Sequence, residues 1–301
     1  MEVNKTKKYL AAVSGGPDSM AMLDIYKNEI YAVCHVNYHD RNDTHIDEEI
    51  VRKYCKDNNI LLYVLDVKQD MYKDIKVKNP QAKYRILRYE FFCDVANKTN
   101  IKTIMVGHNF NDFLETAYMQ KQKNSTSLFY GIKEHGKYND LRIWRPLLYY
   151  SKSTLKNYCE KHFIDYADDW TNNSDMYQRN IVRKIINNMD KYELNKFANW
   201  VSHYNNSNKE KYLEIETLFE NWKNSKFDAK FFTTLNNDYQ YHLVYSFLSF
   251  YNFKNISANK IHSIIQYINK NKIDDKHFRL EDNIYLGISK DNKVVIIQKA
   301  I

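Results

Sequence analysis

YLAAVSGGPDSM, residues 9–20, joins a short apolar run to a glycine-containing turn and then to a second apolar segment. Residues 9–13 are typical of a buried strand, and the apolar positions between Met20 and Ile25 predict a helix with one apolar face. A glycine-rich turn between a strand and a helix exposes backbone N–H groups, and the start of the helix adds a partial positive charge. The stretch therefore predicts a turn that binds phosphate.

Gly15 and Gly16 stand out because the chain has only 6 glycines in 301 residues. Where glycine is this rare, a Gly-Gly pair marks a place that needs an unusual backbone shape, although an ordinary tight turn would use the same pair. Asp18 favours the first interpretation. A carboxylate directed at bound phosphates repels them unless a divalent cation lies between, so Asp18 predicts Mg²⁺. Pro17 suits the first turn of the helix, where a missing N–H costs little.

Strands and helices are predicted to alternate along the first part of the chain. The predicted strands are residues 9–13, 30–37, 60–66 and 102–107. The predicted helices are residues 45–58, 81–98 and about 154–162. Residues 123–140 are polar and are expected to form a loop. Apolar strands separated by helices indicate an α/β fold with a doubly wound, mostly parallel sheet. Ligands of such sheets lie beyond the C-terminal ends of the strands, where Ser14 and Asn37 are expected.

The last third of the chain has a different pattern. Residues 205–224 predict a charged helix, and the isoleucines within residues 261–268 follow the i, i+3, i+4, i+7 spacing of another. Residues 284–298 predict a β-hairpin. We therefore expect a catalytic domain over residues 1–190, followed by a smaller, mainly helical accessory domain over residues 191–301 that ends in this hairpin.

The composition limits the function without naming it. The net charge of +8 indicates an anionic partner, and a hydrophobic fraction of 44% is enough for a sizeable core. The four cysteines include no C-x-x-C pair, so we expect reduced thiols in core positions. No long apolar run opens the chain, so we expect a cytoplasmic protein that does not enter a membrane. The oligomeric state is left open, with a homodimer among the alternatives.

Two pairs of charged side chains at helical spacing are candidates for a site. Arg85 and Arg88 are three residues apart and share one face of a predicted helix, which a solvated surface would also explain. Asp112 and Glu115 are likewise three apart, just after the predicted strand that ends at Gly107. Two carboxylates in this position suit a metal ion or an amine, although acids in a first helical turn also stabilise the helix dipole. The residues alone leave these alternatives open.

Seven short motifs follow one another in a fixed order. They are Ser14-Gly15-Gly16-x-Asp18-Ser19, His35-Val36-Asn37, Arg85-x-x-Arg88-Tyr89, Gly107-His108-x-x-x-Asp112-x-x-Glu115-Thr116, Arg145-Pro146-Leu147, Asp169-x-Thr171-Asn172 and Arg179-Asn180-x-x-Arg183. Together they resemble the tRNA(Ile)-lysidine synthetase family of the PP-loop ATP pyrophosphatase superfamily, over residues 8–190.

The resemblance implies a two-step reaction. ATP adenylates the 2-carbonyl oxygen of the wobble cytidine in an isoleucine tRNA with a CAU anticodon, and pyrophosphate is released. The ε-amine of free L-lysine then displaces AMP and leaves lysidine in the tRNA. The resemblance also implies that the accessory domain grips the tRNA away from the anticodon.

The same resemblance implies roles for individual residues. ATP is expected at Ser14, Gly15, Gly16, Pro17, Asp18, Ser19, His35 and Asn37. The catalytic groups are expected to be Asp18, His108, Asp112, Glu115 and Arg179, with Mg²⁺ at Asp18 and Asp112. Contacts with tRNA or the adenylated base are expected from Arg85, Arg88 and Arg183. His108 is expected to orient its neighbours rather than to act as the base.

Asn109 and Asn111 depart from the family pattern, which usually has a second histidine and an aspartate at these two positions. The family's HVNH-x-L-R motif also differs here, where residues 35–41 read HVNYHDR. The roles of Asn111 and of His39 are therefore open questions.

Two other classes of function compete with this interpretation. Other PP-loop enzymes are a tRNA thiolase, a GMP synthetase or an NAD synthetase, but thiolases commonly use paired cysteines and the synthetases need an ammonia supply. A non-catalytic RNA-binding protein is the second alternative, yet binding alone would not need acids such as Asp18 and Asp112 near phosphates. Release of AMP that depends on tRNA would separate the three.

Overall fold

The computed structural model describes residues 8–40, 43–72, 75, 80–123, 127–167, 178–251, 253, 256–270 and 277–299. The chain forms two compact units, Met1–Ser202 and His203–Ile301, and each is described by itself. The Asp169-x-Thr171-Asn172 motif lies outside the described residues.

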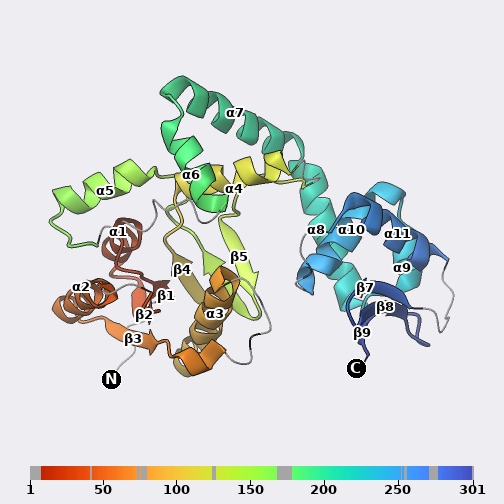
Figure 1. The fold of residues 1–301 in the computed structure, drawn as a ribbon, viewed down its shortest axis with the longest axis horizontal. Helices are drawn as coiled ribbons and strands as arrows, with labels where there is room; N and C mark the ends of the chain where they lie inside the picture. Colours follow the sequence, from red (N-terminus) through yellow and green to blue (C-terminus); the bar gives the residue numbers. More distant parts are fainter. Residues whose placement is uncertain are drawn as a thin grey trace. The chain divides into compact units, whose positions relative to one another are not determined.

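The first unit is built on a six-stranded sheet (Figure 1). Its strands are β1 (Tyr9–Ala12), β2 (Ile30–Asn37), β3 (Leu61–Asp66), β4 (Thr103–Val106), β5 (His135–Tyr138) and β6 (Leu141–Trp144). Their order across the sheet is β3-β2-β1-β4-β6-β5, and all neighbours are parallel except β5 and β6. This confirms the predicted doubly wound, mostly parallel sheet.

The strand order places a ligand crevice beside β1. The chain runs from β1 outward to β2 and β3, and then returns to β4 on the other side of β1. At such a reversal the connections leave β1 and β4 in opposite directions, which opens a crevice beyond the C-terminal ends of these strands. Ser14 follows β1 and His108 follows β4, so both lie at this crevice.

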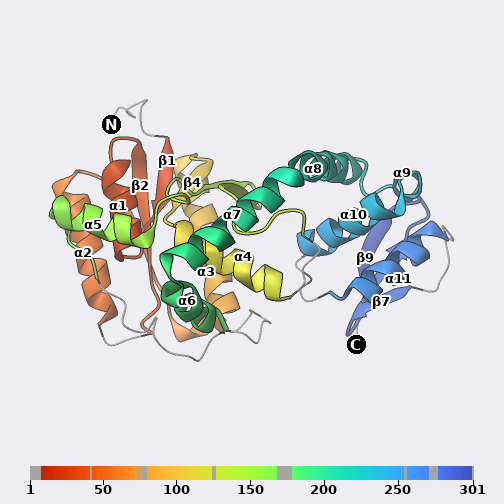
Figure 2. The same cartoon turned by 90° about the horizontal axis from the view of Figure 1, so that it is seen from above.

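Helices cover both faces of the sheet, as Figures 1 and 2 show. One face carries α1 (Pro17–Ile25), α2 (Thr44–Asp57) and α5 (Lys152–Lys161), and the other carries α3 (Pro80–Thr99). Side chains of a strand alternate between the two faces. In β1, Leu10 accordingly packs into the cluster that contains Tyr89 and Phe92 of α3, whereas Ala11 packs into the cluster formed with α1, α2 and α5.

Helices that follow β3 and β4 along the chain complete the described part of the first unit. Helix α4 (Phe110–Gln122) begins shortly after β4 and packs against α6 (Gln178–Asn188). A short 3₁₀ helix, η1 (Gln69–Tyr72), follows β3, and α7 (Lys191–Ser207) follows α6. The two compact units divide within α7, after Ser202. The roles expected for residues 1–190 and 191–301 stay predictions.

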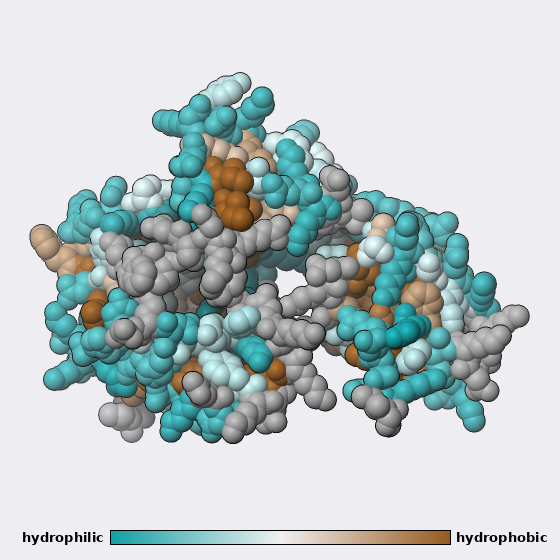
Figure 3. Space-filling view, viewed as in Figure 1, coloured by the Kyte–Doolittle hydropathy of each residue, from teal (hydrophilic) through white to brown (hydrophobic). Residues whose placement is uncertain are grey.

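The second unit combines helices with a small sheet. Its elements are α8 (Lys209–Asn224), α9 (Ala229–Thr233), α10 (Asn237–Phe250), α11 (Ala258–Asn269), β7 (Phe278–Glu281), β8 (Ile284–Ile288) and β9 (Val294–Gln298). The strands form an antiparallel sheet in the order β7-β8-β9. Trp222, Phe232 and Ile264 are fully buried in its core. On the face shown in Figure 3, mostly hydrophilic side chains cover the described parts of each unit.

Two sequence-based expectations about secondary structure were incomplete. Residues 123–140 were expected to form a loop, but β5 lies within them and pairs with β6. Residues of this edge strand alternate between exposed and half-buried, so it lacks the apolar run that marked the inner strands. The predicted C-terminal hairpin is confirmed as β8 and β9, with β7 added as a third strand.

Among the residues that the structure describes, none of the helices has the length and apolar character that crossing a membrane would require.

Candidate active site

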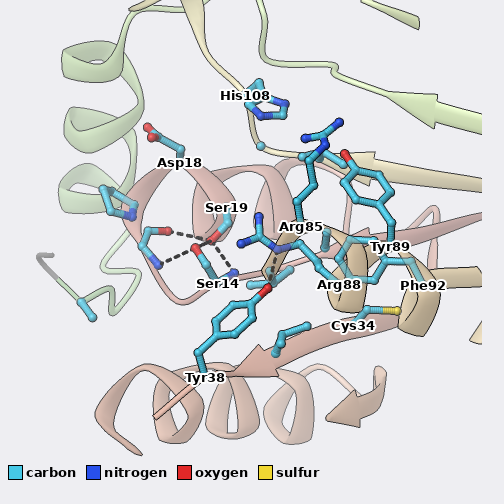
Figure 4. Close-up of a pocket in the computed structure, with 18 of the residues that line it drawn as sticks. Ser14, Asp18, Ser19, Cys34, Tyr38, Arg85, Arg88, Tyr89, Phe92 and His108 are labelled. Carbon is cyan, nitrogen blue, oxygen red and sulfur yellow. Dashed lines mark hydrogen bonds between the residues drawn. The ribbon is translucent and has the colours of Figure 1, made fainter. Parts of the chain in front are cut away.

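A cavity of about 330 Å³ lies beyond the C-terminal ends of β1 and β4 (Figure 4). It brings together many of the predicted site residues, namely Ser14, Gly16, Pro17, Asp18, Ser19, Arg85, Arg88 and His108. Tyr38, Tyr89, Phe92 and Lys152 complete most of its walls. The cavity thus has a turn and a helix start on one side and an aromatic wall with arginines on the other.

The turn after β1 is held by two serine hydroxyls. Ser19 Oγ donates to the carbonyl oxygen of Gly16 at 3.0 Å and accepts from the N–H of Ser14 at 3.1 Å. Ser14 Oγ lies 3.2 Å from Ser19 Oγ and accepts from the N–H of Gly16 at 3.4 Å. Helix α1 begins directly after Gly16, which has no side chain to cap it. The first N–H groups of α1 therefore remain available to an anion.

We expect Gly15→Ala to destabilise the protein more than Gly16→Ala does. Gly15 has a φ of +95°, and a Cβ added there would meet the carbonyl oxygen of Asp47 at 2.9 Å. A backbone held in a sparsely populated region costs roughly 1–3 kcal/mol in the free energy of unfolding. Gly16 has a φ of −75°, and the atoms nearest to an added Cβ are 3.7 and 4.0 Å away. Thermal melting measures both effects, and equal losses of Tm would contradict this prediction.

Asp18 is the acid of the turn. Its Oδ2 accepts from Asn109 Nδ2 at 2.9 Å, whereas the buried Oδ1 has no hydrogen-bond partner among the described residues. Burial raises the pKa of Asp18 to about 6, and the negative charge of Asp112 also raises it, while Lys152 acts in the opposite direction. The folded protein therefore holds this carboxylate in a position where a nearby cation would favour its ionised form.

Asn109 joins Asp18 to the start of α4. Its side-chain oxygen accepts from the N–H of Asp112 at 3.0 Å, and its own N–H donates to Asp112 Oδ2 at 3.1 Å. This reciprocal arrangement is a capping box, which satisfies two N–H groups that the helix leaves unpaired. The side chains of Asp18, Asn109 and Asp112 thus form one connected set.

Glu115 anchors α6 to α4. Its two oxygens accept from Arg179 Nε at 3.1 Å and from Arg183 Nε at 2.9 Å, and its side chain is only 3% exposed. Arg179 also donates through Nη2 to Asp112 Oδ1 at 3.0 Å. Two predicted acids, Asp112 and Glu115, therefore form one ion-pair network with two predicted arginines. These are Arg179 and Arg183, and the network lies outside the cavity lining.

His108 is a neutral hydrogen-bonding group. Burial lowers the pKa of His108 to about 3, and nearby positive charges, above all that of Arg145, lower it further. Arg145 Nε donates to His108 Nδ1 at 3.1 Å, so the proton of the neutral ring belongs on Nε2. An imidazole of such low basicity is a poor proton acceptor at neutral pH.

Aromatic rings hold the two arginines of α3 in the cavity wall. Arg88 Nε donates to Tyr38 Oη at 2.8 Å, and Tyr38 Oη donates to the carbonyl oxygen of Tyr84 at 3.1 Å. The guanidinium carbon of Arg85 lies 4.6 Å from the centroid of the Tyr89 ring. Arginines fixed in this way offer planar, charged donors to a phosphate or a base.

His35 and Asn37, which were expected near the nucleotide, are buried and bonded to the protein. His35 Nδ1 donates to the carbonyl oxygen of Val13 at 2.9 Å, and Asn37 Nδ2 donates to Glu48 Oε2 at 2.9 Å. Neither residue is in the described lining of the cavity. In the structure they fix the end of β2 beside the turn that follows β1.

Lys152 is a charged cavity residue that the sequence did not single out. It is the first residue of α5, follows the N-cap Ser151, and lines the cavity together with the turn after β1. The N–H of Lys152 donates to Asn111 Oδ1 at 3.1 Å, which gives Asn111 a role in holding the start of α5 against α4. The only signal in the sequence was a lysine two residues before a helix predicted to begin at about residue 154.

Comparisons with known proteins agree with this fold. A family model described as the PP-loop domain matches residues 1–189. The U34-tRNA thiolase NcsA from Methanococcus maripaludis is similar in structure, with a TM-score of 0.55 and 18% sequence identity over 68% of this chain and 73% of that chain. At this level of identity the likeness concerns the fold alone.

Two curated relatives are much more similar in sequence. The tRNA(Ile)-lysidine synthase of Ureaplasma parvum is 42% identical over 292 residues, which cover 97% of this chain and 88% of that protein. The tRNA(Ile)-lysidine synthase of Malacoplasma penetrans is 43% identical over 292 residues, which cover 96% of this chain and 98% of that protein. Because these matches span nearly the whole chain and the PP-loop motif forms the predicted turn, the chain belongs to the tRNA(Ile)-lysidine synthase family of PP-loop proteins.

Proposed function

We propose that this chain uses ATP to join free L-lysine to the wobble cytidine of an isoleucine tRNA with a CAU anticodon. The observation that carries the proposal is the connection between the phosphate-binding turn and the acid–arginine network through Asp18, Asn109 and Asp112. Such a connection suits a reaction in which ATP first adenylates the cytidine and an amine held a short distance away then attacks the activated base.

The proposed reaction has two balanced steps. The 2-carbonyl oxygen of the cytidine attacks the α-phosphorus of ATP, the bond to the β-phosphate breaks, and pyrophosphate leaves. The ε-amine of lysine then attacks C2 of the base, the C2–O bond breaks, and AMP leaves with the electron pair. The ammonium group of lysine loses one proton before it attacks, because lysine is protonated in water at neutral pH, and the nitrogen loses a second proton to solvent as AMP leaves.

We place the ATP phosphates at the turn after β1. The hydroxyls of Ser14 and Ser19 and the N–H groups at the start of α1 line one wall, and Lys152 brings a positive charge from α5. Neither hydrogen bond nor ion pair ties the Lys152 ammonium to another described residue. It can therefore neutralise charge on the departing pyrophosphate, and neutralisation and positioning carry most of such catalysis.

Mg²⁺ fits this site at Asp18. The buried Oδ1 of Asp18 lacks a hydrogen-bond partner among the described residues, and Asp18 lines the same cavity as the phosphate-binding groups. A bound divalent cation would supply charge neutralisation between this carboxylate and the phosphates. Asp112 already accepts hydrogen bonds with both oxygens, and the described residues contain no cluster of three or more His, Cys, Asp or Glu suited to a metal. We therefore propose that Asp18 would hold the ion, which would supply charge neutralisation at the ATP phosphates.

We place the lysine amine at Asp112. Glu115 is fully occupied by two guanidinium groups, whereas Asp112 shares one oxygen with Arg179, whose side chain is 42% exposed. An amine can therefore bind this oxygen beside or in place of Arg179. Glu115 and Arg183 would keep α6 attached to α4 while this exchange occurs.

Recognition of the tRNA is assigned to two regions. Arg85 and Arg88 face the cavity that would receive the wobble base, and bases of a single-stranded loop can be turned out of the stack at low cost. In the second unit, exposed aromatic side chains on and just after α10 offer stacking surfaces for other bases. They are Tyr245, Phe250 and Tyr251.

Arg179→Lys is expected to lower the rate of lysine transfer about tenfold or more. Arg179 uses two different nitrogens to contact Glu115 and Asp112, and a lysine cannot reproduce this planar geometry. The matched control is Arg52→Lys, because Arg52 forms an exposed ion pair with Glu48 within α2, where such pairs contribute little. Initial rates of lysine incorporation measure both variants, and equal, small effects would refute a specific role for Arg179.

The proposed function is tested by incubating the purified protein with ATP, total tRNA and L-lysine. Release of pyrophosphate is expected to require tRNA, and release of AMP is expected to require both tRNA and lysine. Release of AMP with ammonia or a sulfur donor in place of lysine would favour another PP-loop activity. The absence of any nucleotide turnover with tRNA and lysine would contradict the proposal.

A further inference from the structure

The side chain of Asn109 holds an unusual position between two acids. It lies at the start of α4, is only 3% exposed, and is separated from Asp18 by 91 residues of sequence. Its amide oxygen accepts from the N–H of Asp112, and its amide nitrogen donates to Asp18 Oδ2. One buried amide therefore contacts both the acid at the phosphate-binding turn and the helix that carries the second acid.

The capping requirement alone does not explain an asparagine. Asparagine, aspartate and serine cap helix N-termini about equally well, because each offers an oxygen to an N–H of the first turn. Of the three, only asparagine adds N–H donors on the same group at a distance that reaches a second partner. An aspartate would instead place a third negative charge beside Asp18 and Asp112.

The contact with Asn109 decides which oxygen of Asp18 a ligand can use. Asp18 Oδ2 is occupied by the amide at 2.9 Å, while the buried Oδ1 has no partner among the described residues. A carboxylate fixed by one oxygen cannot turn freely, so its other oxygen keeps one direction. Asp18 itself lines the cavity together with Ser14, Ser19 and Lys152.

We propose that Asn109 is a positioning residue for the ATP site. Its amide holds the Asp18 carboxylate in one orientation and links it to the helix that carries Asp112. A single side chain thereby fixes the position of Asp18, at the phosphates, relative to Asp112, at the amine. This inference rests on the proposed function, in which Asp18 acts at the phosphates of ATP.

Asn109→Ser tests the proposal because serine keeps a capping oxygen and removes the donor to Asp18. We expect the dissociation constant for ATP in the presence of Mg²⁺, measured by calorimetry, to rise roughly tenfold, since a hydrogen bond to a charged group is lost. Asn236→Ser is the matched control, because Asn236 caps α10 by the same contact, to the N–H of Tyr239 at 3.0 Å. Both variants are expected to lower Tm, Asn109→Ser by more because it also loses the contact with Asp18, and only Asn109→Ser should weaken ATP binding.

A double-mutant cycle separates positioning from a general structural effect. If Asn109 acts through Asp18, then Asn109→Ser will weaken ATP binding much less in protein that already carries Asp18→Asn. Equal losses in both backgrounds, or unchanged ATP affinity in the single variant, would overturn the proposal. Should Asn109→Ser fail to fold, Asn109→Asp keeps the size and the cap, and it is expected to weaken ATP binding further by adding charge.

These measurements need neither tRNA nor lysine. If the wild-type protein binds ATP but forms no lysidine, the proposed function fails while the effect of Asn109 on ATP binding can still be read. If the wild-type protein is fully active and Asn109→Ser binds ATP normally, only the positioning role fails.

Discussion

Asp18→Asn is expected to lower the rate of ATP-dependent pyrophosphate release on the order of a hundredfold or more. The substitution removes the negative charge that would hold Mg²⁺ at the phosphates, while an amide of the same shape can still accept from Asn109 Nδ2. The protein should nevertheless melt at an equal or a higher temperature. Burial raises the pKa of Asp18 to about 6, so without a bound cation the ionised carboxylate opposes folding at neutral pH, and a neutral side chain removes that cost.

Asp24→Asn in the same helix is the control, and the opposite result is expected there. Burial raises the pKa of Asp24, but hydrogen bonds from Tyr54 and Tyr158 and the charge of Lys27 outweigh it and hold the pKa below its usual value. Tyr54 Oη and Tyr158 Oη donate to Asp24 at 2.6 and 2.7 Å. Asp24→Asn should therefore lower Tm and leave ATP binding intact. Near-normal turnover in Asp18→Asn would remove Asp18 from the mechanism.

Asp112→Ala is expected to lower lysine transfer by about a hundredfold while pyrophosphate release falls much less. The loss combines a charge-assisted hydrogen bond to the amine with the contact that holds Arg179, and hydrogen bonds to charged groups contribute about 1.5–3 kcal/mol each. Pyrophosphate release should persist because Asp18 and the turn after β1 are left in place. Rapid-quench measurements of pyrophosphate and of labelled lysine in tRNA follow the two steps separately.

Glu193→Ala controls for the damage that Asp112→Ala does to the helix start. Glu193 and Asp190 exchange the same kind of reciprocal hydrogen bonds at the start of α7, at 2.8 and 3.2 Å. Loss of that pair should cost a similar amount of stability with little change in either step. Equal losses of both steps in Asp112→Ala would assign Asp112 to ATP activation instead of to the amine.

The fold was predictable wherever burial leaves a pattern in the sequence. The inner strands β1, β2 and β4 are covered on both faces, so their apolar runs identify them within one or two residues. The edge strand β5, with the sequence HGKY, is partly solvated and gave no such pattern. Its existence depends on pairing with β6, which local sequence does not encode.

The site was predictable as a set of residues but not as a set of contacts. Gly15 and Asp18 could be identified because the glycine pair stands out in a glycine-poor chain and the acid follows it at the start of a helix. The pairing of Glu115 with Arg179 and Arg183 joins positions more than sixty residues apart, and it depends on how α6 packs against α4. Lys152 is one of 45 lysines and arginines, and only the strand order brings it to the cavity.

The most direct test compares two tRNAs that carry the same CAU anticodon, the isoleucine tRNA and the methionine tRNA. The purified protein is incubated with each tRNA, ATP and labelled L-lysine, and the wobble nucleoside is then isolated. The account predicts ATP-dependent labelling of the wobble nucleoside in the isoleucine tRNA, with AMP released in equal amount, and no labelling of the methionine tRNA. Failure to label the isoleucine tRNA, or labelling that does not require ATP, would contradict it.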